Sequence, residues 1–148
     1  INDSVATRPE RAQATPQART SLSGKRVLLV EDNDLNMEIA EFYLDHAGAA
    51  VVKAWNGKEA VQTFASSKPG VISLVLMDLM MPVMDGYEAT RAIRALDRPD
   101  ASSVPIIAMT ANAFDEDRKK SKAAGMNAHL AKPLDMQALL SAAGRFCE

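Results

Sequence analysis

The chain has 148 residues, 47% of them hydrophobic, and a net charge of −2, which is enough apolar material for the core of one domain. The near-neutral charge, without a dense basic run, argues against a nucleic-acid surface, and the apolar stretches are too short to cross a bilayer. One cysteine, Cys147, allows no internal disulfide and fits a reducing compartment. We therefore expect a cytoplasmic domain without direct membrane contact.

The first part of the chain differs in composition from the rest. Residues 1–23 are rich in Arg, Ala, Gln, Thr and Pro and have almost no large apolar side chains, so they cannot bury enough surface to offset the entropy of ordering. We predict a flexible linker over residues 1–23 and a folded domain over residues 24–148. Because the chain opens on Ile1 rather than methionine, we expect it to be a fragment of a longer protein.

From residue 25 onward, short apolar runs alternate with segments of helical periodicity. The runs predict strands over residues 25–31, 50–54, 71–77, 104–109 and 126–131. The periodic segments predict helices around residues 37–47, 60–65, 89–96 and 136–143. Residues 115–120 are charged with little apolar pattern, which predicts a loosely held fourth helix.

Capping signals agree with these helices, since Asn56 and Asp85 each precede a glutamate by three residues and Asp135 stands before the last helix. The alternation of strands and helices indicates an α/β fold, a doubly wound five-stranded parallel sheet with helices on both faces. For strand order 2-1-3-4-5, ligands bind at the carboxyl ends of the strands, between strands one and three.

Ionisable groups stand at the ends of three of these strands. Glu31 and Asp32 follow the first, Asp78 ends the third, and Lys132 follows the fifth. A cluster of carboxylate oxygens suits Mg²⁺, and the cation can neutralise incoming phosphoryl oxygens. We predict Asp78 as a nucleophile that forms an aspartyl phosphate, because it ends the most apolar strand. Thr110 and Lys132 could bind phosphoryl oxygens at the same edge.

A purely structural interpretation exists for each of these residues. An acid just after a strand is often a helix cap, and Asp34 could cap the first helix in this way. Thr110 could be an ordinary hydroxyl at a strand end, and Lys132 could be a surface charge. The functional interpretation depends on several such residues meeting at one edge of the sheet.

Four segments resemble the receiver domain of response regulators, a family with the CheY-like, flavodoxin-like fold. They are VLLVEDN at 27–33 with Asn36, LMDLMMPVMDG at 76–86, MTANA at 109–113 and AKPL at 131–134, and the resemblance covers about residues 25–147. It implies a role for each of six residues. These are Asp78 as phosphoacceptor and metal ligand, Asp32 as direct Mg²⁺ ligand, the main-chain carbonyl of Met80 as a further ligand, Glu31 acting through water, Thr110 as switch hydroxyl, and Lys132 as the cation that pairs with the phosphoryl group.

One position departs from the family pattern. Three residues before Lys132 the family usually has Tyr or Phe, and here it is His129. A switching role for His129 and plain surface packing both remain open. We also predict a cis peptide bond between Lys132 and Pro133, because the chain turns at once into the last helix while Lys132 must point toward Asp78, and the family commonly has one there.

The resemblance implies that the chain is the receiver of a two-component phosphorelay. Its partners would be a histidine kinase transmitter, a histidine phosphotransfer protein, or both. The isolated domain would be a monomer that catalyses only its own phosphorylation and dephosphorylation. The parent would be a hybrid sensor histidine kinase, for which an anchor in the inner membrane is compatible. The alternatives are a docking module that regulates an attached kinase without phosphate and, less favoured, a free-standing phosphatase.

Overall fold

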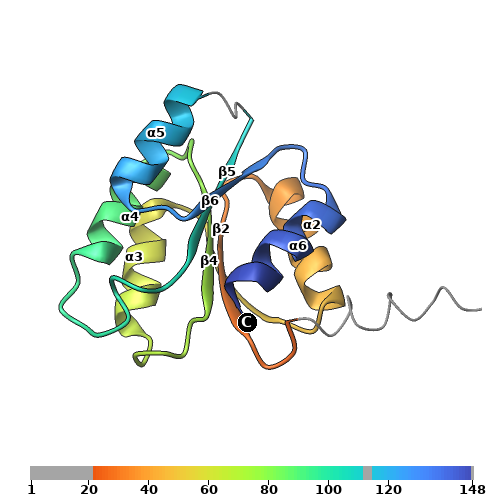
Figure 1. The fold of residues 1–148 in the computed structure, drawn as a ribbon, viewed down its shortest axis with the longest axis horizontal. Helices are drawn as coiled ribbons and strands as arrows, with labels where there is room; N and C mark the ends of the chain where they lie inside the picture. Colours follow the sequence, from red (N-terminus) through yellow and green to blue (C-terminus); the bar gives the residue numbers. More distant parts are fainter. Residues whose placement is uncertain (1–21, 112–114, 148) are drawn as a thin grey trace, which may run out of the picture.

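The computed structural model describes residues 22–111 and 115–147, and within them five parallel strands lie between two layers of helices (Figure 1). The strands are β2 (Arg26–Val30), β3 (Ala50–Ala54), β4 (Leu74–Asp78), β5 (Ile106–Thr110) and β6 (Ala128–Ala131). Their spatial order is β3-β2-β4-β5-β6, which is 2-1-3-4-5 in chain order and confirms the predicted topology. No helix in this part of the chain is both long and apolar enough to cross a membrane.

β6 begins two residues later than its predicted run, and β4 and β5 also begin later than theirs. Val71 is exposed and its N–H bonds the carbonyl of Lys68 in a turn, so β4 begins only at Leu74. The N–H of Val104 likewise bonds Asp100, and Pro105 has no N–H to donate, so β5 begins at Ile106. Both strands also extend one residue further than predicted, and they include Asp78 and Thr110.

The helices are α2 (Asp34–His46), α3 (Gly57–Ser66), α4 (Gly86–Arg94), α5 (Asp115–Ala124) and α6 (Met136–Phe146). The predicted caps Asn56, Asp85 and Asp135 are confirmed, because each side chain accepts a backbone N–H three residues on. The suggestion that Asp34 caps the first helix is wrong. Asn33 has the extended backbone of an N-cap and accepts the N–H of Asn36, and Asp34 lies inside the first turn.

The sheet carries a separate apolar cluster on each face. Figure 1 shows α2 and α6 on one side of the sheet and α3, α4 and α5 on the other. Leu29, Leu44 and Leu139 belong to the first cluster, and Leu28, Phe64 and Ile93 belong to the second. Successive residues of β2 therefore pack on opposite faces, which is the burial expected of a central parallel strand.

Both ends of the described chain lie at the amino ends of the strands. Leu22 is buried in the core although it falls within the predicted linker over residues 1–23, and its N–H bonds the carbonyl of Ala47 just before β3. Cys147, a free and buried cysteine, lies 4.0 Å from the carbonyl oxygen of Ser73, just before β4. Residues 1–21 lie outside the described part of the chain.

The loop between β4 and α4 is held by two glycines. The N–H of Gly57 bonds the carbonyl of Met84, and the N–H of Gly86 bonds that of Leu79. A Cβ on Gly86 would collide with the carbonyl oxygen of Asp78, and one on Gly57 would collide with that of Met84. Between these anchors Val83 has φ +72°, a conformation that costs a β-branched residue about 1–3 kcal/mol.

We predict that Gly86→Ala lowers the free energy of unfolding by about 1–3 kcal/mol, because backbone atoms at the end of β4 must move to admit the methyl group. Chemical denaturation measures the change. Gly144→Ala is the control, since nothing lies within 4 Å of the added atom in α6, and it should stabilise the domain by about 0.5–1 kcal/mol. Equal stability of Gly86→Ala and the wild type would contradict this account of the loop.

Candidate functional site

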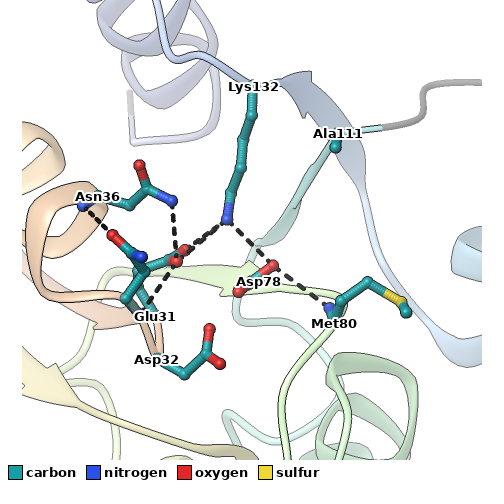
Figure 2. A pocket seen from close by; sticks show the side chains of 8 residues that line it. Glu31, Asp32, Asn36, Asp78, Met80, Ala111 and Lys132 are labelled. Atoms are coloured by element: carbon teal, nitrogen blue, oxygen red, sulfur yellow. Dashed lines mark hydrogen bonds and ion pairs between the residues drawn. The ribbon is translucent and has the colours of Figure 1, made fainter.

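A pocket of about 240 Å³ opens at the carboxyl ends of the strands (Figure 2). Its lining residues come from the ends of β2, β4, β5 and β6 and from the first turn of α2, and they are Glu31, Asp32, Asn33, Asn36, Asp78, Met80, Ala111 and Lys132. The parallel sheet brings these residues together, since strand ends that are far apart in sequence meet at one edge. The pocket lies where strand order reverses, between β2 and β4.

The Lys132 ammonium lies between two buried carboxylates. Its Nζ is 2.7 Å from Glu31 Oε2 and 3.1 Å from Glu31 Oε1, and it is 3.3 Å from Asp78 Oδ1. Glu31 and Asp78 are only 1% and 3% exposed. The pairing of Lys132 with Glu31 was not predicted, because 101 residues separate them and no local pattern signals the contact.

These contacts set the protonation of the pocket. Burial and then the charge of Glu31 raise the pKa of Asp78 to about 7, against the opposing effects of Lys132 and the Met80 N–H. Burial disfavours the charged form of Lys132, but its bond to Glu31 and the charges of both acids prevail, so the pKa of Lys132 lies above its ordinary value. Lys132 therefore stays charged, and Asp78 exchanges a proton near neutral pH.

The acids at this edge fit a divalent cation. Glu31, Asp32 and Asp78 each offer a carboxylate oxygen within 4.8 Å of the others. Asp32 is exposed, and Figure 2 shows its carboxylate beside that of Asp78. Both oxygens of Glu31 already contact Lys132, which leaves Asp32 and Asp78 better placed to bind a metal directly. A few carboxylates with room for water is the arrangement that Mg²⁺ prefers.

Main-chain and amide groups complete the pocket. The N–H of Met80 donates to Asp78 Oδ1 at 3.3 Å, which fixes the orientation of that carboxylate. Asn36 Nδ2 donates to Glu31 Oε1 at 3.3 Å. No role for Asn36 was predicted, although it belongs to the first of the four segments. The sequence signal that could have predicted this contact is the position of Asn36 in the first turn of α2, five residues after Glu31.

Thr110 and His129, the two proposed switch residues, are not among the residues that line the pocket. Thr110 is buried at the end of β5, and its carbonyl accepts the N–H of Lys132 at 2.9 Å. His129 is half-buried in β6, with Nε2 2.8 Å from the hydroxyl of Ser121 in α5. His129 therefore contacts a helix rather than only solvent, and whether it switches stays a prediction. The Lys132–Pro133 bond is cis, as predicted.

Comparisons with known proteins agree on one family. The family model described as the response regulator receiver domain matches residues 27–144. The peroxide stress-activated histidine kinase mak1 of Schizosaccharomyces pombe is 41% identical over 118 residues, covering 79% of this chain and 7% of that protein. The chain spans 7–15% of the length of the curated relatives it matches.

Two solved structures are informative for the pocket. The receiver domain of the sensor histidine kinase PA1611 from Pseudomonas aeruginosa, with a magnesium ion coordinated in its active site cleft, is 40% identical. Its TM-score is 0.76, over 84% of this chain and 98% of that one. The receiver domain of Ssk1 from Saccharomyces cerevisiae, in complex with the histidine phosphotransfer protein Ypd1, is 31% identical with a TM-score of 0.77, over 85% and 90%.

We predict that Asp78→Asn raises the free energy of unfolding at pH 8 in metal-free buffer by about 1–3 kcal/mol. The pKa of Asp78 is about 7 in the folded domain against an ordinary 3.8, so the stability this group confers is complete below pH 4 and is lost as the pH rises through 7. The gain from the neutral amide should therefore shrink between pH 8 and pH 5. Denaturation at four pH values measures it.

Asp100→Asn is the matched control. A hydrogen bond from Arg98 lowers the pKa of Asp100, so this group is charged in both the folded and the unfolded chain above pH 5. Its substitution should lower stability by the same amount from pH 5 to pH 8. A gain for Asp78→Asn that does not change with pH would contradict the account of the buried charge.

Proposed function

The chain belongs to the response regulator receiver domain family, and from this membership and the geometry of the pocket we propose that it accepts a phosphoryl group on Asp78 in a phosphorelay. The observation that carries the proposal is the contact of Lys132 Nζ with both Glu31 and Asp78 beside the exposed acid Asp32. If the contact between Lys132 and Asp78 opens during the reaction, Lys132 keeps its ion pair with Glu31 and stays charged.

The proposed reaction is a phosphoryl transfer from a phosphohistidine. A carboxylate oxygen of Asp78 attacks phosphorus, the P–N bond to the imidazole breaks, and the nitrogen keeps the electron pair. Lys132, which contacts Asp78 Oδ1, would pair with a phosphoryl oxygen as negative charge collects there. The N–H of Met80 holds the carboxylate in one orientation while it attacks.

Asp32, Asp78 and the main-chain carbonyl of Met80 are the proposed ligands of Mg²⁺, with Glu31 acting through water. The acid cluster and the magnesium-containing receiver of PA1611 support this assignment. When bound, the cation would neutralise the phosphoryl oxygens that otherwise meet three carboxylates. It would also lower the pKa of Asp78, which favours the nucleophilic form.

The proposed partners carry the histidine. A histidine phosphotransfer protein is the main candidate, because the similar receiver of Ssk1 was solved in complex with one. A kinase transmitter is the other, since the curated relatives include histidine kinases, and we propose a hybrid histidine kinase as the parent protein. The rival proposal is a docking module that works without phosphate. It does not explain why Lys132 contacts two buried acids at the pocket.

Thr110 and His129 are proposed to report the phosphorylated state. Thr110 is joined through its carbonyl to the backbone of Lys132, and His129 is joined to α5 through Ser121. A change at the pocket can therefore reach α5 through β5 and β6. A cytoplasmic location is part of the same proposal, and the free, buried Cys147 is compatible with it.

We predict that Asp78→Asn abolishes base-labile phosphate incorporation from phosphoramidate and Mg²⁺, because an amide cannot form the acyl phosphate. Intact-mass measurement should show the added phosphoryl group on the wild type and not on the variant. Asp85→Asn, which keeps a side chain able to cap α4, is the control and should be labelled normally. Undiminished labelling of Asp78→Asn would move the nucleophile to another residue.

We predict that Mg²⁺ binds weakly and that Asp32→Ala removes binding more completely than Glu31→Ala, because Glu31 is already engaged by Lys132. Calorimetric titration at pH 8 compares the variants. For the wild type, affinity should also fall by about tenfold per pH unit below pH 7, since the cation must displace the proton of Asp78. Equal loss in the two variants would argue against the direct role of Asp32.

A further inference from the structure

Two arginines at and just after the end of α4 bond the carboxyl-terminal ends of the neighbouring helices, which lie in the same layer (Figure 1). Arg94 Nε and Nη2 donate to the carbonyl oxygen of Gly125, directly after α5, at 3.0 and 2.7 Å. Arg98 Nη1 donates at 2.6 Å to the carbonyl oxygen of Phe64, near the end of α3. Each arginine therefore ties the end of α4 to a different helix.

Arg94 holds three segments of the chain at once. Besides Gly125, it bonds the carbonyl oxygens of Val104 and Ala101 through Nη1, at 2.7 and 3.0 Å, and Asn127 Oδ1 through Nη2, at 3.0 Å. These bonds use every N–H group of the guanidinium, and all the acceptors are neutral. The half-buried cation is thus held by geometry rather than by an opposite charge. We call this set of bonds the Arg94 clamp.

The other end of α4 lies against the proposed phosphoacceptor. The N–H of Gly86, the first residue of α4, bonds the carbonyl of Leu79, and a Cβ on Gly86 would collide with the carbonyl oxygen of Asp78. Met80 lies in the loop between β4 and α4, and its N–H donates to Asp78 Oδ1. A change in the charge and size of the Asp78 side chain therefore acts on the backbone that leads into α4.

α4 can transmit a displacement from one of its ends to the other. It is a helix of nine residues, about 13 Å long, and a capping box between Asp85 and Glu88 closes its first turn. Ala89 and Ile93 are fully buried in the apolar cluster on that face of the sheet. A short helix that is capped and packed in this way moves as a rigid element, so a shift at its start reaches its end.

α5 has little packing that would resist such a shift. Over residues 118–124 only Ser121 and Ala124 are buried, and Ser121 is held to β6 by a hydrogen bond. A helix with so few buried apolar contacts opens or moves at low cost. Gly125 follows α5 directly, so the Arg94 clamp determines where the carboxyl-terminal end of this helix lies.

We propose that α4 carries the phosphorylation state of Asp78 to α5, and that the Arg94 clamp is the point of transfer. The inference rests on the proposed function and adds a second connection to α5, separate from the one through β5 and β6. Arg94 is a positioning residue, since it lines no part of the pocket. Phosphorylation displaces the start of α4, and the end of α5 follows through the clamp.

Hydrogen exchange of the α5 amides, with and without phosphoramidate and Mg²⁺, tests the proposal. Excess donor maintains phosphorylation, and intact mass gives the phosphorylated fraction of each sample. In the wild type, phosphorylation should change the exchange rates of α5 severalfold. In Arg94→Lys this difference should be lost, because an ammonium cannot reproduce the planar fork of bonds to Gly125 and Val104. The phosphorylated fraction should match the wild type, because the pocket is unchanged.

Arg98→Lys is the matched control. Arg98 uses the same type of fork, but its bonds go to Asp100 and to the end of α3, and none of them reaches α5. This variant should lose a similar amount of thermal stability and keep the full difference in α5. Gly125→Ala is a second test variant, since its methyl carbon would lie 3.1 Å from Arg94 Cγ and displace the clamp. It should lose the difference as Arg94→Lys does.

A full phosphorylation-dependent difference in α5 of Arg94→Lys would overturn the proposal, and so would an equal loss in Arg98→Lys. If Arg94→Lys does not fold, a full difference in Gly125→Ala overturns it instead. A wild type that is phosphorylated without any change in α5 would overturn the connection and leave the proposed function standing. A wild type that phosphoramidate does not label would overturn both.

Discussion

The architecture of the pocket depends on one shared cation, the Lys132 ammonium between Glu31 and Asp78. Two buried carboxylates at neighbouring strand ends repel each other, and burial makes the charged form of each costly. Lys132 directly follows β6, which lies two strands away from β4, so the compensation of the acids depends on the pairing of β4, β5 and β6. Burial and the charge of Glu31 raise the pKa of Asp78, and the same cation opposes that rise, so the pKa is about 7. Lys132 therefore affects both the stability of the buried acids and the protonation of Asp78.

The periodic features of the fold could be predicted from the sequence, and the pairwise contacts could not. Strand and helix alternation, three caps and the convergence of Asp78 with Lys132 follow from local patterns and from the geometry of parallel sheets. The contact between Lys132 and Glu31 depends on side-chain reach across two strands, which no pattern records. Asn33 rather than Asp34 caps α2 because backbone geometry decides between two adjacent residues that are both suitable caps. The positive φ of Val83 could not be predicted either, because β-branched residues such as valine rarely adopt that conformation.

Helix α5 is attached to the sheet differently from the other helices. Between Arg118 and Ala124 the buried side chains are only Ser121 and Ala124, and Ser121 hydrogen-bonds His129 of β6. A hydrogen-bonded attachment is easier to exchange than a packed apolar one, because both partners can bond water when the contact opens. His129 lies in β6, three residues before Lys132, which directly follows the end of that strand. The weakly apolar helix and the charged pocket are thus joined through one short segment of backbone.

Both ends of the described chain leave the domain on the side away from the pocket, with Leu22 bonded to Ala47 and Cys147 beside Ser73 (Figure 1). The consequence is modularity. A neighbouring domain, a reporter protein or a solid support can be joined to either end. In each case the junction lies at the amino edge of the sheet. Such a fusion need not shield the reactive carboxylate from a diffusing protein. The domain can therefore be moved between larger proteins, in evolution or in the laboratory, with its reactive face left open to solution.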